Sequence, residues 1–287
     1  MMHSPSPQEA FAPGKIILSG EYAVIFGAPG IAIPSPLKTE VRIEPDQNTR
    51  GITIENKSYP DRTYIQRIIE LCEAHTGPLK GTLQIDSTIP VGRGMGSSTA
   101  LVVALARCFD LHKPEVLAIE KTLNPHQSGI DFEVIWQNRP LKFIKGQESE
   151  SIHLDLSFLN KATFIDTGKP NETTAELVEW VIKQGRNMSA LHTISSCTTR
   201  LLSGESPLTV FPDHHRAQVQ LGIIPQNVQK FINEIEESGG TAKVLGAGGK
   251  TGGGGIVLVL HNDPSNLASS YGFHTLLTQH RLCEILG

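Results

Sequence analysis

Alternation of apolar and polar residues predicts strands near the start of the chain. Val41 and Ile43 alternate with polar residues, and Ile52 and Ile54 repeat this pattern. A period of two is typical of strands with one buried face, so both segments are predicted to be half-buried strands. The apolar residues that follow fall on one face of a helix, a stripe more often found in a core than in a functional site: Tyr64, Ile65, Ile68, Ile69 and Cys72.

The most informative pattern surrounds a glycine-rich loop. Leu83 and Ile85 alternate as in a strand, and the apolar run 101–106 is typical of a helix. Between them lies the loop 89–100, Ile-Pro-Val-Gly-Arg-Gly-Met-Gly-Ser-Ser-Thr-Ala. Glycine lacks a side chain, so main-chain N–H groups of such a loop can face an anion, and a helix N-terminus adds further donors. The pattern predicts a glycine-rich loop between a strand and a helix, in a form that could bind phosphate.

The remaining pattern predicts helices and strands on both sides of a second glycine-rich run, 246–255. Pro114 suits the first turn of one helix, and Pro225 suits another that ends at Gly239–Gly240. A long helical region is expected from 173 to 202, followed by a turn-like segment to 212. Strands are expected at 140–146, 152–156, 163–165, 243–245 and 256–260.

Composition narrows the class of protein. A chain of 287 residues can form one large domain or two packed ones. The net charge of −4 argues against a nucleic-acid surface, and no apolar stretch approaches the ~18–20 residues of a membrane span. Residues 1–11 are polar and proline-rich and are expected to form an irregular lead-in. The cysteines are widely spaced, which is typical of reduced thiols in a cytoplasmic protein: Cys72, Cys108, Cys197 and Cys283.

Two familiar phosphate motifs do not describe the first loop. It lacks the Gly-Lys-Ser/Thr ending of a Walker loop, and Ser97 stands where a dinucleotide fingerprint has its third glycine. Ser97 or Ser98 can cap the following helix, and a hydroxyl there can also ligate a phosphate-bound Mg²⁺. Taken alone, the loop could therefore be either a structural turn or a phosphate site.

Several charged residues allow two interpretations. Lys15 and Glu21 lie in an apolar run punctuated by glycine and proline, where they could form a mutual ion pair or bind an anionic substrate. Asp131 follows Ser128-Gly129 and could simply be a turn-forming residue. His214-His215 could suggest a metal, but the sequence offers no suitably spaced third ligand.

The combination of segments resembles the GHMP small-molecule kinases. The loop 89–100 resembles their nucleotide-binding loop, the run 12–29 resembles their first motif, and the run 246–255 resembles their third, with Lys250-Thr251 interrupting it. Glu120 precedes Asp131 by 11 residues, as in mevalonate kinases. The chain is most similar to bacterial mevalonate kinases, and all three motifs occur in family order.

The resemblance implies a fold and an activity. The fold is α+β, with a ribosomal-S5-like, ATP-binding N-terminal domain over residues 1–160 and a ferredoxin-like C-terminal domain over residues 161–287. The activity is transfer of the ATP γ-phosphoryl group to the 5-hydroxyl of mevalonate, in isoprenoid precursor synthesis. ATP and Mg²⁺ are the implied cofactors.

The resemblance also implies roles for individual residues. Asp131 would accept or orient the hydroxyl proton, and Lys15 would stabilise the negative charge of the transition state. Ser98 and Glu120 would hold Mg²⁺. The triphosphate would be bound by Gly92, Arg93, Gly94, Met95, Gly96, Ser97 and Ser98. The acceptor would be bound by Glu21, Tyr22, Thr167, Thr174 and Gly248.

Departures from the family pattern keep alternatives open. Tyr22 stands where mevalonate kinases usually have His, and Thr167-Gly168-Lys169-Pro170 resembles phosphomevalonate kinases. The interrupted third motif and the short interval of 33 residues from Ser98 to Asp131 would also suit a non-catalytic metabolite-binding relative. Another GHMP alcohol kinase is a further alternative. The expected partner is mevalonate or a related hydroxy acid, with no nucleic acid or membrane; dimers are common in the family, so a homodimer is one expected assembly.

Overall fold

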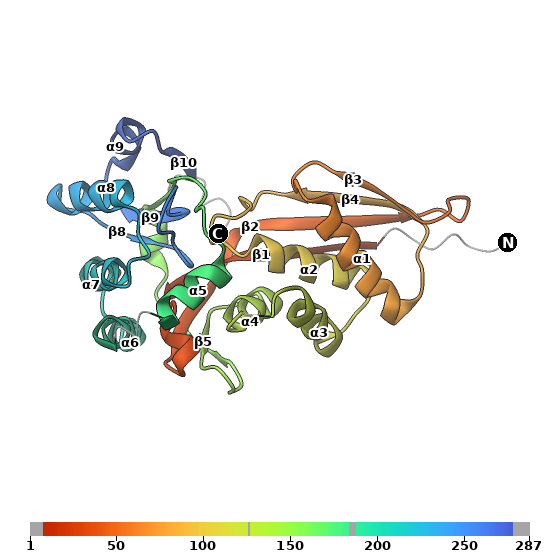
Figure 1. Cartoon of the computed structure of the whole chain (residues 1–287), viewed down its shortest axis with the longest axis horizontal. Coiled ribbons are helices and arrows are strands. Elements are labelled where there is room, and N and C mark those ends of the chain that lie inside the picture. The colour runs from red at the N-terminus through yellow and green to blue at the C-terminus, as the bar shows by residue number, and fades with distance from the viewer. Residues whose placement is uncertain (1–7, 126, 184–187, 278–287) are drawn as a thin grey trace. The chain divides into compact units, whose positions relative to one another are not determined.

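The computed structural model describes residues 8–125, 127–183 and 188–277, and Figure 1 labels its elements. Cys283 lies outside the described residues. In chain order the elements are β1 (Gln8–Ser19), η1 (Ala23–Phe26), β2 (Gly30–Pro45), β3 (Ile52–Asn56), α1 (Arg62–Thr76), β4 (Gly81–Ser87), α2 (Ser97–Cys108), α3 (Lys113–Leu123), α4 (Ile130–Gln137), β5 (Leu141–Phe143), β6 (Glu150–Ser151), η2 (Ser157–Lys161), β7 (Ala162–Asp166), α5 (Thr174–Lys183), α6 (Met188–Leu202), α7 (Pro207–Gln220), α8 (Gln226–Glu237), β8 (Thr241–Val244), β9 (Ile256–Leu260), α9 (Pro264–Ser270) and β10 (His274–Leu277). This mixture confirms the expected α+β class.

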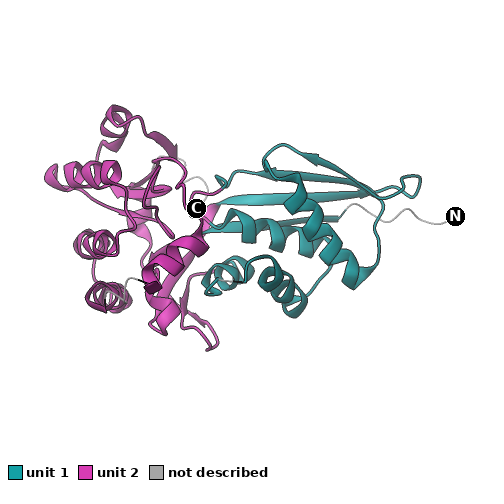
Figure 2. Ribbon diagram, in the orientation of Figure 1, with its two compact units in different colours: residues 1–15, 37–91, 96–138 teal, residues 16–36, 92–95, 139–287 magenta. Residues whose placement is uncertain are grey.

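Contacts between residues divide the chain into two compact units (Figure 2). Unit 1 comprises residues 1–15, 37–91 and 96–138, and unit 2 comprises residues 16–36, 92–95 and 139–287. The strands β1 and β2 contribute residues to both units. Unit 2 includes two segments from the N-terminal half of the chain, so the division at residues 160 and 161 stays a prediction.

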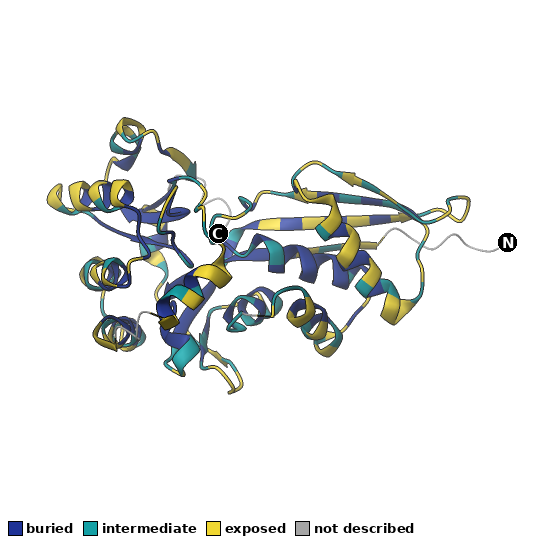
Figure 3. Ribbon diagram, in the orientation of Figure 1, coloured by how far each residue is buried: buried dark blue, intermediate teal, exposed yellow. Residues whose placement is uncertain are grey.

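Unit 1 contains a sheet whose buried face is formed by the predicted alternating residues. The strand β4 pairs antiparallel with β2 and parallel with β3, so that Leu83 lies opposite both Ile43 and Ile54. A parallel pair needs a crossover connection, which α1 supplies between β3 and β4. The predicted stripe on α1 is confirmed as core, because Ile65, Ile68, Ile69 and Cys72 are buried. Figure 3 shows buried residues alternating with more exposed ones along β2 and β4, whereas Ile52 and Ile54 of β3 are only partly buried.

The helix α2 follows the first glycine loop, as predicted. Gly96 occupies its N-cap position with a left-handed backbone, and every residue from Ala100 to Ala106 is fully buried. A helix that is apolar on all sides belongs in a protein core. The start of α2 is therefore fixed by tight packing.

Unit 2 contains an antiparallel sheet in the order β10-β7-β9-β8, with helices packed against it (Figure 1). Its core includes the buried stripe Val228, Phe231, Ile232 and Ile235 of α8, which has helical spacing. Between β8 and β9 the chain forms the second glycine-rich loop, 246–255. None of the helices in the described ranges combines the length and the apolar character that a membrane span requires.

Three expectations about secondary structure are wrong. Residues 152–156 do not form a strand, since β6 is confined to Glu150–Ser151. The expected lead-in is shorter, because β1 begins at Gln8. The segment expected to be turn-like contains the start of α7, which includes Pro212. The Ser206 side chain accepts a hydrogen bond from the Leu208 N–H, Pro207 occupies the first turn, and burial of Val210 and Phe211 outweighs the cost of the internal proline.

Candidate active site

In unit 1 the structure brings together the two residues predicted to be catalytic. The Lys15 Nζ lies 3.1 Å from Asp131 Oδ1. Lys15 is near the end of the unit 1 part of β1, and Asp131 is in the first turn of α4. The mutual Lys15–Glu21 ion pair considered from sequence is therefore replaced by a pair that joins both predicted catalytic groups.

Gly96 allows Lys15 to follow this path. A Cβ at Gly96 would lie 2.9 Å from Lys15 Cγ and 3.0 Å from Ile135 Cδ1, and the backbone φ is +77°. A larger residue would clash with the lysine stem and would also be strained in this conformation. The absence of a side chain at Gly96, the third glycine of the loop, thus leaves the space through which Lys15 reaches Asp131.

Glu120 is buried next to the start of α2. Its Oε1 accepts hydrogen bonds from Thr99 Oγ1 at 2.8 Å and from Asn124 Nδ2 at 3.2 Å, whereas Oε2 is buried without a partner among the described residues. Burial raises the pKa of Glu120 from its ordinary 4.5 to about 7, and the negative charge of Asp131 adds to this effect. The hydrogen bonds from Thr99 and Asn124 act in the opposite direction.

This geometry fits the predicted magnesium role. An unpartnered buried carboxylate oxygen is costly unless a cation or donor satisfies it. The described residues contain no group of three or more His, Cys, Asp or Glu side chains that could hold a metal ion. Mg²⁺ is commonly bound by one or two protein oxygens together with substrate phosphates and water, so Glu120 and the predicted Ser98 suit a metal that arrives with ATP.

In unit 2 the two glycine loops pack main chain against main chain. The Ile256 N–H donates to the Arg93 carbonyl at 3.1 Å. A Cβ at Gly94 would lie 2.6 Å from the Leu245 carbonyl oxygen, and one at Gly246 would lie 2.8 Å from the Gly94 carbonyl oxygen. Only glycine permits this approach. The segment 92–95 is therefore held by the second loop.

The side chains of Arg93 and Met95 in this segment have structural roles. The Arg93 Nε pairs with both carboxylate oxygens of Asp166, at 2.8 and 3.0 Å, and Met95 is fully buried. Asp166 also accepts a hydrogen bond from the Gly168 N–H. Phosphate binding by Arg93 or Met95 side chains stays a prediction, and this geometry favours binding through the main chain.

Glu21 belongs to a sealed cluster with Lys243 and His214. The Lys243 Nζ lies 2.6 Å from Glu21 Oε1, and His214 Nε2 lies 3.0 Å from Glu21 Oε2. The three side chains are 2%, 0% and 0% exposed for Glu21, Lys243 and His214, so water does not reach them. Lys243 also donates to the carbonyls of Ile17 and Leu18, at 2.9 and 3.2 Å.

The cluster balances its charges. Burial alone would raise the pKa of Glu21, but attraction to Lys243 and the contact with His214 lower it to about 2. Burial, together with the positive charge of Lys243, lowers the pKa of His214. Glu21 is therefore ionised and His214 neutral at pH 7, with Lys243 as the balancing cation. This position favours a structural role for Glu21 over the predicted contact with acceptor.

Tyr22 connects the cluster to the second glycine loop. Its hydroxyl donates to the Ala247 carbonyl at 2.5 Å, and burial followed by the charge of Glu21 raises its pKa, so the hydroxyl remains a donor. The Tyr22 backbone has φ +63°, which costs a bulky residue about 1–2 kcal/mol unless the surroundings impose it. The preceding residue, Glu21, is held in the buried cluster, and the Tyr22 hydroxyl is held by Ala247, so both the main chain and the side chain of Tyr22 are fixed.

The other predicted acceptor residues lie near the same loop or at a helix start. The Thr167 hydroxyl donates to the Gly255 carbonyl at 2.8 Å and accepts from the Gly254 N–H at 3.0 Å. Gly248 packs against the Ile223 main chain. Thr174 is exposed at the first residue of α5, while the preceding Thr173 forms the capping interactions with Glu176. Of these three, Thr174 is the one left facing solvent.

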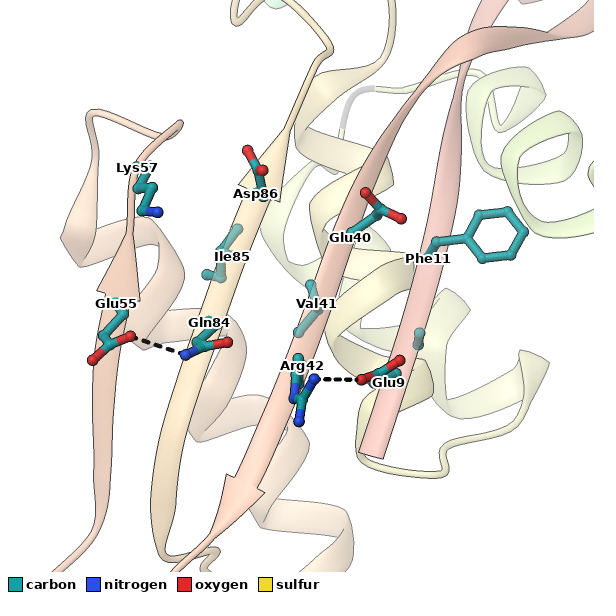
Figure 4. Close-up of a pocket in the computed structure, with 11 residues that line it drawn as sticks. Glu9, Phe11, Glu40, Val41, Arg42, Glu55, Lys57, Gln84, Ile85 and Asp86 are labelled. Atoms are coloured by element: carbon teal, nitrogen blue, oxygen red, sulfur yellow. Dashed lines mark hydrogen bonds and ion pairs between the residues drawn. The ribbon is translucent and has the colours of Figure 1, made fainter. Parts of the chain in front are cut away.

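A large surface groove in unit 1 does not suit phosphate. It has a volume of about 600 Å³ on the outer face of the sheet, and Figure 4 shows its charged side chains projecting from the strands. Arg42 pairs with Glu9 at 2.9 Å, and Gln84 donates to Glu55 at 3.1 Å. Acidic residues outnumber basic ones along its lining, so the groove would repel a polyphosphate.

Sequence reasoning missed several partners in these sites. Thr99, Lys243 and Asp166 were not singled out, and His214 was considered only as a metal ligand. A single lysine within the apolar strand β8 was a usable signal, because a charge there requires a buried counter-ion. The three consecutive hydroxyl residues 97–99 were a signal for Thr99.

The buried cluster predicts a stability effect. Lys243→Met leaves the Glu21 carboxylate buried without its cation, so we expect the free energy of unfolding to fall by about 3–5 kcal/mol. The double variant with Glu21→Gln should lose less than the sum of the two single losses. The exposed Lys38–Glu40 pair, at 2.7 Å, provides the control, since Lys38→Met should change stability by less than about 1 kcal/mol. Urea unfolding measures each value; equal losses at Lys243 and Lys38 would contradict the assignment.

Glu120 predicts a pH dependence of stability in the metal-free protein. Its raised pKa means that the folded state holds a proton between pH 4.5 and about 7 that the unfolded state releases, so this contribution is lost as pH rises through that window. Glu120→Gln should therefore stabilise the protein by about 3 kcal/mol at pH 8 and by much less at pH 5, as measured by unfolding in EDTA. An equal effect at both pH values would contradict the raised pKa.

The chain is similar to known proteins in sequence and in fold. Residues 63–129 match the protein family described as "GHMP kinases N terminal domain". The mevalonate kinase of Thermococcus sibiricus is 28% identical and is aligned over 84% of this chain and 86% of its own length. This relative is archaeal, whereas the motif resemblance pointed to bacterial members.

Solved structures show the same fold. Methanococcus jannaschii mevalonate kinase matches with a TM-score of 0.78 and 20% identity, over 96% of this chain and 98% of that chain. L. major mevalonate kinase in complex with R-mevalonate matches with a TM-score of 0.73 and 20% identity, over 94% of this chain and 92% of that chain. Residues 63–129 thus match a GHMP kinase family, and over most of its length the chain is similar to mevalonate kinases in sequence and in fold.

Proposed function

We propose that this protein is an ATP-dependent small-molecule kinase that phosphorylates the 5-hydroxyl of mevalonate. The observation that carries the proposal is the Lys15–Asp131 pair, 3.1 Å apart, next to the helix that follows the glycine loop. The mevalonate kinases among its relatives support the choice of acceptor. The proposed product is 5-phosphomevalonate.

The proposed chemistry assigns one task to each polar group. The acceptor oxygen forms a bond to the γ-phosphorus while the bond from that phosphorus to the bridging oxygen breaks. The hydroxyl proton passes to the Asp131 carboxylate, and the Lys15 ammonium offsets negative charge that develops on the transferred group. Main-chain N–H groups of the glycine loop bind the phosphates. Mg²⁺, when bound through Ser98 and Glu120, supplies further positive charge to the phosphates.

The structure weakens one argument for a phosphorylated acceptor. The phosphomevalonate kinase alternative rests in part on Tyr22, which stands where mevalonate kinases usually have a histidine. The Tyr22 hydroxyl is buried and donates to the Ala247 carbonyl, so it supports the second glycine loop. We propose the same supporting role for Glu21 and Thr167, whose polar atoms face other protein groups.

Location and assembly are further proposals. The three described cysteines, Cys72, Cys108 and Cys197, are buried free thiols, and burial raises the pKa of each. Unpaired thiols of this kind are typical of a reducing compartment, which favours the cytoplasm. A homodimer is the assembly we propose from the family resemblance.

Asp131→Asn tests the catalytic assignment. The variant keeps the shape of the residue but cannot accept the proton, so turnover with MgATP and mevalonate should fall by about 10²–10⁴-fold. Affinity for ATP should change by no more than about threefold, because Asp131 is assigned to the hydroxyl. Steady-state ADP release and equilibrium nucleotide binding measure the two quantities.

Glu133→Gln is the matched control for this substitution. Glu133 is also in the first turn of α4, so both variants remove one negative charge from the same helix end. Its carboxylate pairs with Lys113 at 2.9 Å instead of Lys15. Glu133→Gln should keep near-normal turnover; near-normal turnover in Asp131→Asn would remove Asp131 from the mechanism.

A further inference from the structure

We propose that Lys169 binds a phosphate group of the nucleotide and that the Lys250-Thr251 insertion in the second glycine loop holds Lys169 in place. This inference rests on the proposed binding of ATP by the first glycine loop and adds a residue to which the sequence analysis assigns no role. It also gives a structural role to Lys250-Thr251, which the sequence analysis identifies only as an interruption of the third motif.

Lys169 lies along the first glycine of the phosphate loop. A Cβ at Gly92 would lie 3.1 Å from Lys169 Cε, 3.6 Å from Cδ and 3.7 Å from Cγ. The lysine stem therefore covers Gly92, and the ammonium is one bond beyond the nearest of these atoms. Both residues belong to unit 2.

The Lys169 ammonium is available for a ligand. The side chain is exposed, and within residues 8–125, 127–183 and 188–277 it has no ion pair or hydrogen bond. The nearest cation on the loop itself, Arg93, is already paired with Asp166. A free ammonium beside glycine-rich main chain is the arrangement that binds phosphate oxygens as a point charge.

The insertion fixes the chain just after Lys169. Glu172 accepts hydrogen bonds from the N–H groups of Lys250 and Thr251, at 3.0 and 3.2 Å, and from Thr251 Oγ1 at 2.7 Å. The Asn171 side chain donates to Thr251 Oγ1 at 3.1 Å, and its main-chain N–H donates to the Thr251 carbonyl at 3.2 Å. Five hydrogen bonds thus join the two inserted residues to Asn171 and Glu172.

The same loop also contacts Lys169 and a neighbouring helix. The Gly253 N–H donates to the Lys169 carbonyl at 3.0 Å, and Pro170 bridges to Gly252. The Lys250 ammonium lies 3.4 Å from the centre of the Trp180 ring on α5, so it packs on an aromatic face. The inserted residues therefore contact Asn171, Glu172 and Trp180, while the Lys169 ammonium has no partner within the described ranges.

Equilibrium binding of MgATP tests the proposal. Lys169→Ala should weaken MgATP binding about tenfold, and raising the salt concentration should shrink this difference because the contact is ionic. Lys169→Arg should keep most of the affinity, and binding of adenosine should not change. Lys161→Ala is the control, since Lys161 is another exposed lysine of unit 2 and lies at the end of η2.

The insertion is tested by Glu172→Ala and by deletion of Lys250-Thr251. Each should weaken MgATP binding in the same direction as Lys169→Ala. Combined with Lys169→Ala, each should add little, because both act through the same ammonium. Glu172→Ala keeps the test meaningful if the deletion variant fails to fold. Fully additive losses would overturn the positioning role of the insertion.

The outcomes separate this inference from the proposed function. If the unmodified protein does not bind MgATP, the proposed function fails. If it binds MgATP and Lys169→Ala binds equally well, the proposed function stands and this inference is overturned. If Lys169→Ala instead raises only the KM for phosphomevalonate, the phosphate at Lys169 belongs to the acceptor, and the assignment to the nucleotide is overturned.

Discussion

Close main-chain contact between residues 92–95 and the second glycine loop is the constraint on which the candidate site in unit 2 depends. Gly94 and Gly246 approach each other with no room for a Cβ on either residue, and the Ile256 N–H joins the Arg93 carbonyl. Phosphate binding through N–H groups requires those groups to be held in one arrangement. The second loop supplies that support, and Tyr22, Thr167 and the inserted Thr251 in turn support the second loop.

Buried charge follows a consistent rule in both units. Glu21, ionised in a sealed core, has Lys243 as its cation, and the cluster has no net charge. Glu120 differs because, among the described residues, no cation pairs with it, and burial raises its pKa to about 7. A carboxylate paired with a buried cation stabilises structure, whereas one that lacks a cation is suited to a ligand that brings its own positive charge. The two glutamates therefore serve different purposes.

The sequence predicts the local elements well because they follow from short-range pattern. The strand that contains Leu83, the helix after the glycine loop and the stripe on α1 are all confirmed. Lys15 and Asp131 could be proposed as partners because family resemblance supplied their roles. Glu21 could not be assigned to Lys243, which lies 222 residues away and is brought near only by folding. The start of α7 was missed because the segment before Pro212 is polar and turn-like in sequence, whereas tertiary packing maintains a helix there.

The most direct measurement is ADP release from MgATP with mevalonate and with phosphomevalonate in parallel. The proposed function predicts steady turnover with mevalonate and only background release with phosphomevalonate. Turnover with phosphomevalonate alone would contradict the assigned acceptor, although the phosphoryl-transfer chemistry would stand. Nucleotide binding without turnover of either acceptor would contradict the catalytic role given to Lys15 and Asp131.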